Sequence, residues 1–369
     1  MMPRSSRAAA LVMLAMLPAA CSLPGSTAKS PSPAASSTRS STPSPSQSPS
    51  SPPVTGSFGV LVSSLSGTSY TVSLVGIDGR VIASAIANTP GTVTCANTAA
   101  GIVPPPVSTS DSRVYFMDSL GVVRYLTPNG DTGQAATLPI GPARRSLFAV
   151  SPDDTLMAVV VLDFTAGGAT TKLYMYQLQN GGSQSLLYSQ SGAFTLWPTG
   201  WRGMTSLVVA KVPACTQGGG PLCCGPQEFH VVDPNTAVRR FIVGGPTCVV
   251  AGPPSPGGVV CEDTTDYSQA NVLDWTGVMV NSYPVSGPTP AYLSPDGKAF
   301  AVDTAAAPTT TVYPANVTVN LSTCGWIDNT HLLSGGDAQH QPSVGNITTG
   351  QVVPVAALGD CAGRIPGGL

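Results

Sequence analysis

Short apolar runs that end in turn-forming residues recur along most of the chain. The two clearest are Ala149–Val160 (AVSPDDTLMAVV) and Ala291–Val302 (AYLSPDGKAFAV). In each, the proline after serine suits the second position of a tight turn, and the aspartate that follows can bond back to local amide groups. The next residue, Asp154 or Gly297, accepts the dihedral angles that close the turn. Each phrase therefore predicts two buried β-strands joined by a hairpin.

Weaker copies of this phrase give the chain a repeat. The position held by serine in the two clear copies recurs at Ser110, Ser151, Trp201, Ser255, Ser294 and Trp326. These positions lie on average about 43 residues apart, and a period of roughly 40–45 residues is typical of four-stranded propeller blades. We therefore predict an all-β protein with a β-propeller of seven blades. Six or eight blades are alternatives, and a β-sandwich is the main rival fold.

The first predicted unit is shorter than the others. The seven units begin near residues 58, 104, 146, 195, 245, 288 and 322. The first lacks a clear opening hairpin and offers only three strands. In a closed ring, a strand from the other terminus can complete such a blade and remove an exposed sheet edge. No window after the N-terminal segment predicts an amphipathic helix.

The Ser-Pro-Asp-Gly units resemble the repeats of TolB-type β-propellers and of the propellers attached to prolyl oligopeptidase-like enzymes. The resemblance covers about residues 58–363 and is most specific in the two clear copies. It implies the fold. It carries no activity, because the motif is a structural turn and propellers host many functions.

The N-terminus predicts export and a lipid anchor. Residues 1–21 combine Arg4 and Arg7, a short apolar stretch and small residues before Cys21, which is typical of a secretory signal peptide. The segment Leu-Pro-Ala-Ala-Cys at 17–21 resembles a bacterial lipobox, although that family prefers leucine where this chain has proline. The resemblance implies lipidation of Cys21 on the outer side of the bacterial cytoplasmic membrane. A plain signal peptide is the alternative.

A spacer follows the signal segment. Residues 22–57 are dominated by serine, proline and threonine, which cannot bury enough apolar surface to fold. We predict a disordered linker there and a propeller domain over residues 58–369. No later segment has about 18 uncharged apolar residues in a row, so no transmembrane span is predicted.

The composition argues against some partners. Only 9% of the 369 residues are charged and the formal net charge is −2. A typical domain has roughly 25% charged residues. The sequence therefore shows no basic footprint for nucleic acid and no acidic field for a basic partner.

The chain has nine cysteines, and the eight that follow Cys21 suggest disulfides in an exported protein. They are Cys95, Cys215, Cys223, Cys224, Cys248, Cys261, Cys324 and Cys361. Cys248 and Cys261 flank a Pro/Gly-rich hairpin and are predicted to pair. Cys215 is expected to pair with Cys223 or Cys224, and Cys361 with Cys324 or Cys95.

Motifs for catalysis or cofactor binding are missing from the sequence. It contains no Gly-x-Ser-x-Gly elbow, phosphate loop, dinucleotide fingerprint or His-Glu-x-x-His helix. A metal site from Cys215, Cys223, Cys224 and His230 matches no zinc spacing. The acidic stretch 262–266 is interpreted as a solvated hairpin loop, with calcium binding or glycosidase chemistry as weaker hypotheses. We predict no cofactor and no metal.

Tryptophans offer the remaining hint of a contact surface. Trp201 and Trp326 hold equivalent repeat positions, so packing between blades is expected. Trp197 and Trp275 are freer to line a mouth or a face, and are predicted to contact a partner.

These patterns predict a membrane-anchored extracytoplasmic propeller that acts as a non-catalytic ligand-binding, protein-binding or scaffold module of the cell envelope. The ligand would lie in the axial channel or on the loop-rich face. The alternative is a propeller enzyme acting on glycans, or a quinoprotein-like dehydrogenase. That alternative requires convergent carboxylates, or a histidine with an arginine, at the mouth of the channel. It would be favoured if one pocket held three or more of a set of six residues: Asp263, Asp266, Asp303, Asp328, His331 and Arg202.

Overall fold

The computed structural model describes most of the chain after the linker. The described residues are 55–94, 100–101, 106–165, 168–179, 182–214, 228–285, 290–304 and 308–369. The signal segment, most of the linker and five cysteines (Cys21, Cys95, Cys215, Cys223 and Cys224) lie outside these ranges. The predictions made for them stay predictions. Within the described ranges, no helix is long and apolar enough to cross a membrane.

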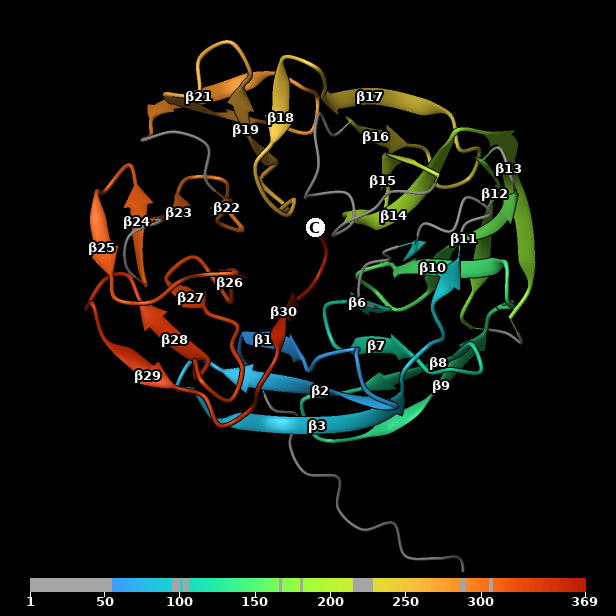
Figure 1. Ribbon diagram of the computed structural model, residues 1–369, viewed down its shortest axis with the longest axis horizontal. Helices are drawn as coiled ribbons and strands as arrows, with labels where there is room; N and C mark the ends of the chain where they lie inside the picture. Colours follow the sequence, from blue (N-terminus) through green and yellow to red (C-terminus); the bar gives the residue numbers. More distant parts are fainter. Residues whose placement is uncertain are drawn as a thin grey trace, which may run out of the picture. The chain divides into compact units, whose positions relative to one another are not determined.

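Seven four-stranded antiparallel sheets surround a common axis, so the described part of the chain is an all-β, seven-bladed propeller (Figure 1). Blade 1 contains β1 (Phe58–Val62), β2 (Ser69–Gly76), β3 (Val81–Asn88) and β30 (Asp360–Ile365). Blade 2 contains β6 (Val107–Thr109), β7 (Val114–Met117), β8 (Val122–Leu126) and β9 (Thr132–Thr137). Blade 3 contains β10 (Arg144–Val150), β11 (Leu156–Thr165), β12 (Gly168–Gln177) and β13 (Gln184–Gly192). The predicted fold class is confirmed.

The remaining blades follow the same order. Blade 4 contains β14 (Phe194–Arg202), β15 (Ser206–Pro213), β16 (Glu228–Val232) and β17 (Arg239–Gly244). Blade 5 contains β18 (Cys248–Val250), β19 (Val259–Asp263), β20 (Gln269–Leu273) and β21 (Met279–Pro284). Blade 6 contains β22 (Ala291–Leu293), β23 (Phe300–Thr304), β24 (Thr309–Tyr313) and β25 (Val317–Val319). Blade 7 contains β26 (Gly325–Trp326), β27 (His331–Leu333), β28 (Ser343–Asn346) and β29 (Val352–Pro354).

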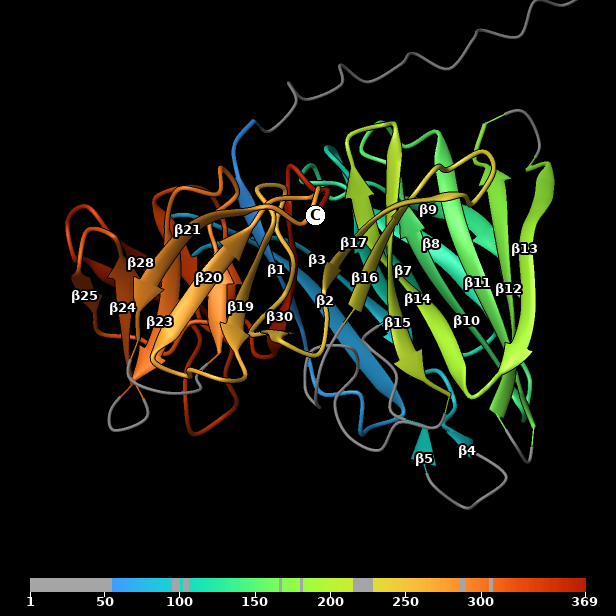
Figure 2. The same ribbon diagram turned by 90° about the horizontal axis from the view of Figure 1, so that it is seen from above.

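The ring closes through both ends of the domain. Strand β30 pairs antiparallel with β1, with Phe58 opposite Ile365 and Val62 opposite Asp360. The short first unit is therefore completed by a C-terminal strand, as the sequence predicts. Seen from the side, the C-terminus lies near one face of the ring, and a two-stranded pair, β4 (Val93–Thr94) and β5 (Ala100–Gly101), lies at the other (Figure 2).

The Ser-Pro-Asp phrases form the hairpin between the first and second strands of their blades. The Ser151 hydroxyl donates to Asp153 Oδ1 at 2.7 Å and accepts from the amide of Leu156 at 2.9 Å. The Ser294 hydroxyl makes the same two bonds, to Asp296 at 2.7 Å and from Ala299 at 3.0 Å. The serine and aspartate of each phrase therefore have a structural role, which is to stabilise the hairpin turn.

The residue after each aspartate has the predicted left-handed backbone. Asp154 has φ of 62° and Gly297 has φ of 72°. Asp154 also accepts a hydrogen bond from the Tyr115 hydroxyl of blade 2 at 2.8 Å. The turns therefore connect neighbouring blades as well as closing their own hairpins.

Trp201 and Trp326 pack between blades, as predicted. The indole N–H of Trp201 donates to the carbonyl of Ala149 in blade 3 at 3.0 Å. That of Trp326 donates to the carbonyl of Tyr292 in blade 6 at 2.7 Å. Each acceptor lies two residues before the turn serine of the preceding blade. Buried apolar side chains fill the spaces between adjacent blades. They do not fill the axis of the ring, where a cavity lies.

Candidate functional site: an axial cavity

A cavity of about 390 Å³ lies on the axis of the ring and takes lining residues from all seven blades. Ligand pockets in proteins commonly have volumes of roughly 300–1,000 Å³. The innermost strand of each blade, or the turn that follows it, supplies most of the wall. Representative lining residues are Val107, Leu147, Trp197, Pro254, Leu293 and Trp326, and blade 1 contributes β30.

The C-terminal end of the chain lies near the centre of the ring (Figure 1), and Gly368 and Leu369 form part of the cavity wall. The amide of Gly367 donates to the carbonyl of Ser110 at 2.7 Å, and that of Leu369 donates to the carbonyl of Trp201 at 3.1 Å. The Leu369 side chain is buried. A Cβ atom at Gly200 would lie 2.9 Å from its Cδ2 atom, so a larger residue there would displace this segment.

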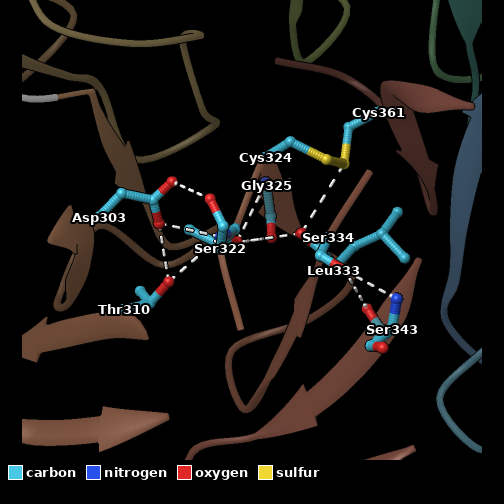
Figure 3. The surroundings of a disulfide bond; sticks show 10 residues. Asp303, Thr310, Ser322, Cys324, Gly325, Leu333, Ser334, Ser343 and Cys361 are labelled. Carbon is cyan, nitrogen blue, oxygen red and sulfur yellow. Dashed lines mark hydrogen bonds between the residues drawn. A yellow bond between two sulfur atoms is a disulfide. The ribbon is translucent and has the colours of Figure 1, made fainter. Parts of the chain in front are cut away.

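A disulfide bond also lies in the wall of the cavity. Cys361 of β30 is bonded to Cys324, the residue before β26, with their Cα atoms 5.6 Å apart (Figure 3). Of the two partners expected for Cys361, the structure therefore selects Cys324. Cys248 and Cys261 form the other predicted bond, across β18 and β19.

Three of the hydroxyl groups among the lining residues bond to the fold itself. Ser108 Oγ accepts from the amide of Val150 at 2.9 Å. Ser255 Oγ donates to the carbonyl of Ser294 at 3.0 Å, and Thr199 Oγ1 donates to that of Val208 at 3.1 Å. These polar atoms thus stabilise the wall of a mainly apolar cavity.

Arg364 has the only charged side chain among the described residues that line this cavity. One Nη atom donates to the carbonyl of Pro366 at 2.8 Å. Burial lowers the pKa of the Arg364 guanidinium, and the charges of Asp111 and Asp328 act in the opposite direction. No carboxylate in the described part of the chain forms an ion pair with Arg364.

The two predicted contact tryptophans have different surroundings. Trp197 is buried, lines the cavity and has an indole N–H without a hydrogen-bond partner. Trp275 is also buried, and its N–H donates to the carbonyls of Ser255 at 3.0 Å and Pro256 at 3.1 Å. Trp275 therefore bonds within its own blade, packs against Phe229 of blade 4, and has no exposed surface for the expected partner contact. For Trp197, contact with a ligand stays a prediction.

None of the six residues named for the enzyme alternative, Arg202 among them, lines the axial cavity. Asp263 accepts from the amide of Thr265 at 2.8 Å, and Asp266 from that of Ser268 at 3.0 Å. Both aspartates are therefore occupied within local turns. Asp263 belongs to β19, so the acidic stretch is a loop only after this residue.

Asp303, Asp328 and His331 also bond to nearby groups. Asp303 accepts from the hydroxyls of Thr310 at 2.8 Å and Ser322 at 2.6 Å (Figure 3). Asp328 lies 3.0 Å from His331 Nδ1. Burial tends to raise the pKa of Asp328, but hydrogen bonds from Thr330 and His331 hold that pKa below its usual value.

His230 lies in a second hollow, of about 480 Å³, between blades 3 and 4. Its Nε2 atom lies 2.6 Å from Glu228 Oε1, and Lys211 Nζ lies 3.3 Å from Glu228 Oε2. Within the described ranges, no three His, Cys, Asp or Glu residues gather in a way that could hold a metal ion. The three cysteines considered with His230 lie outside these ranges.

No protein-family model and no curated protein sequence matches the chain. Among solved structures, prolyl oligopeptidase B from Galerina marginata is 8% identical with a TM-score of 0.39, and the match covers 83% of this chain. Sqt1 of Saccharomyces cerevisiae is 14% identical with a TM-score of 0.42, over 82% of this chain and 87% of the other. The Cps50 (Swd1) β-propeller of Myceliophteria thermophila is 11% identical with a TM-score of 0.40, over 70% and 89%.

The chain spans less than half of the prolyl peptidase structures that it matches, 41% of a prolyl endopeptidase and 43% of prolyl oligopeptidase B. These weak similarities concern the fold and carry no functional information. The sheets and their order define the chain as a seven-bladed β-propeller.

Proposed function

We propose that this protein is a lipid-anchored, extracytoplasmic β-propeller that acts as a non-catalytic binding module of the cell envelope, with its ligand in the axial cavity. The cavity itself carries the proposal. It has the volume of a small-molecule site, and all seven blades contribute to its wall. Because the seven blades form a closed ring, the lining residues can hold their positions for a ligand without movement of the strands.

The chemistry of the wall favours binding over catalysis. General acid–base catalysis needs a titratable side chain within hydrogen-bond reach of the reacting group. Among the described lining residues there is no aspartate, glutamate, histidine or lysine. The carboxylates considered for an enzyme lie outside this lining and bond to nearby amide and hydroxyl groups.

The location is proposed from the N-terminal sequence. The signal segment ends in Cys21, and residues 22–57 would extend over at most about 110 Å as a proline-rich spacer. A lipid on Cys21 would hold the chain at the membrane, while the spacer would let the propeller reach through the cell envelope.

Native mass spectrometry of the full chain, purified from bacterial membranes in mild detergent, tests both parts. We expect a diacyl or triacyl mass on the mature N-terminus and one additional non-covalent mass. Cys21→Ala should lose the lipid and appear in the soluble fraction, whereas Ser22→Ala should remain in the membrane.

A bulkier side chain in the cavity should remove the non-covalent mass. Pro254→Trp introduces an indole into the wall, and Leu120→Trp introduces the same group at an exposed site as the matched control. Circular dichroism would confirm that both variants are folded. A bound mass that persists in Pro254→Trp, or no bound mass in the wild type, would contradict the proposed site.

A further inference from the structure

We propose that the axial cavity binds a small, mainly apolar molecule that carries one anionic group, and that Arg364 binds this anion. This inference rests on the proposed function, because it specifies the ligand of the same cavity. The wall of this cavity is mainly apolar and has one charged side chain, that of Arg364.

The apolar part of the ligand follows from the wall. Leu147, Phe148, Leu293, Trp326 and Pro254 line the cavity from four different blades. Transfer of an apolar surface from water to such a wall is favourable, and ligand pockets are typically lined in this way. A ring system or a short branched chain therefore suits the body of the cavity.

A sugar or another polyol suits this wall poorly. Such a ligand needs many hydrogen-bonding groups, since each hydroxyl that is removed from water must find a new partner. Here the Ser108, Thr199 and Ser255 hydroxyls already bond to backbone atoms. The observation separates the proposed ligand class from glycans.

The anionic part follows from Arg364. A guanidinium has five N–H donors and stays charged in proteins, and it matches the geometry of a carboxylate. The structure shows one hydrogen bond from this side chain, to the Pro366 carbonyl, so donors remain for a ligand. A partly buried cation is stabilised strongly by an anion that makes charge-assisted hydrogen bonds.

The carboxylates near Arg364 form no ion pair with its guanidinium in the described part of the chain. Asp111 and Asp328 act on Arg364 through their charge, but neither forms an ion pair with it. Asp328 faces His331 instead, at 3.0 Å from Nδ1. The guanidinium is thus available to the cavity in the described structure.

Ring closure explains why Arg364 lies at this position. Strand β30 is the innermost strand of blade 1 because it pairs with β1, whose other neighbour is β2. The bond from Cys361 to Cys324 attaches the same strand to blade 7. These two connections hold the segment that carries Arg364 against the axis.

Isothermal titration with two matched probes tests the inference. The probes are 2-naphthoate and 2-naphthamide, which share one apolar body and differ in charge. The full chain is titrated in detergent, with a detergent-only blank. We expect one naphthoate per protein, bound about 10- to 100-fold more tightly than the amide, which is the usual value of a hydrogen bond to a charged group.

Variants at Arg364 locate the effect. Arg364→Gln should weaken naphthoate binding to the level of the amide and leave amide binding unchanged. Arg364→Lys, which keeps the charge, should retain part of the preference. Arg80→Gln removes an exposed arginine in the β2–β3 turn of blade 1 and should change neither affinity. Thermal unfolding of each variant would show that the fold is retained.

The outcomes separate this inference from the proposed function. Equal affinity for the two probes, or full naphthoate binding by Arg364→Gln, would show that the anion preference is wrong while the cavity still binds. Binding of neither probe would overturn the proposed ligand class. The proposed function itself is judged independently, by the bound mass and its loss in Pro254→Trp.

Discussion

At the scale of single residues, a buried serine closes the inner hairpin in four blades. These residues are Ser110, Ser151, Ser255 and Ser294. Their hydroxyls accept hydrogen bonds from amide groups of the turn, and such buried amides are costly to leave without a partner. The recurrence of serine and aspartate therefore has a structural cause, although these residue types are also common in active sites.

The Ser294→Ala variant measures how much the hydrogen bonds of this turn contribute to the free energy of unfolding. The amide of Ala299 would lose its acceptor, and Asp296 would lose the hydroxyl donor. We expect a loss of about 1–3 kcal/mol in the free energy of unfolding, measured by urea denaturation. Ser185→Ala, at an exposed position of β13, should change this value by less than about 0.5 kcal/mol. An equal effect of the two substitutions would contradict the role assigned to the turn serine.

The residue scale also shows where prediction from the sequence ends. The hairpin turns are predictable because proline, aspartate and glycine act on their immediate neighbours. The burial of Trp275 could not be predicted from neighbouring residues, because its indole N–H bonds to the carbonyl of Ser255, 20 residues earlier in the same blade. The sequence around Arg364 does not indicate that this residue lines a cavity, because only closure of the ring brings β30 to the axis.

At the scale of elements, two features hold the first and last blades together. Strand β30 completes blade 1, and the Cys324–Cys361 bond attaches it to blade 7. The short first unit made the completing strand predictable. The disulfide partner of Cys361 could not be chosen from the sequence, because the distance between two cysteines depends on the closed ring.

The two described disulfides should differ in their effect on stability. Cys324–Cys361 has a sequence separation of 37 residues, and Cys248–Cys261 one of 13. In the chain-entropy description, the longer loop gives about 1 kcal/mol more stabilisation. We expect the double variant Cys324→Ser/Cys361→Ser to lower the free energy of unfolding by that much more than Cys248→Ser/Cys261→Ser.

Chemical denaturation of both double variants under non-reducing conditions checks this prediction. The wild type in the same buffer is the reference for each. A larger loss of unfolding free energy on removal of the Cys248–Cys261 bond would contradict the prediction that the Cys324–Cys361 bond, which holds β30, contributes more to stability.

At the scale of the whole molecule, the seven-bladed ring makes the candidate site. The repeat period predicted the blades, and the turn residues predicted most of their inner hairpins. The cavity was foreseen only as an axial channel. Its wall combines residues as distant in the sequence as Val107 and Arg364, and their side-chain packing is set by the closed ring. The volume of the cavity and its one charged side chain could therefore be found only from the structure.

The most direct test of the account is to locate a ligand by anomalous scattering. Crystals of the folded protein would be soaked with 6-bromo-2-naphthoate, and data would be collected at the bromine absorption edge. The account predicts one main bromine peak in the axial cavity, with the carboxylate on Arg364 and the ring beside Leu293 and Trp326. A main peak outside the cavity, or no peak at full soaking concentration, would contradict it.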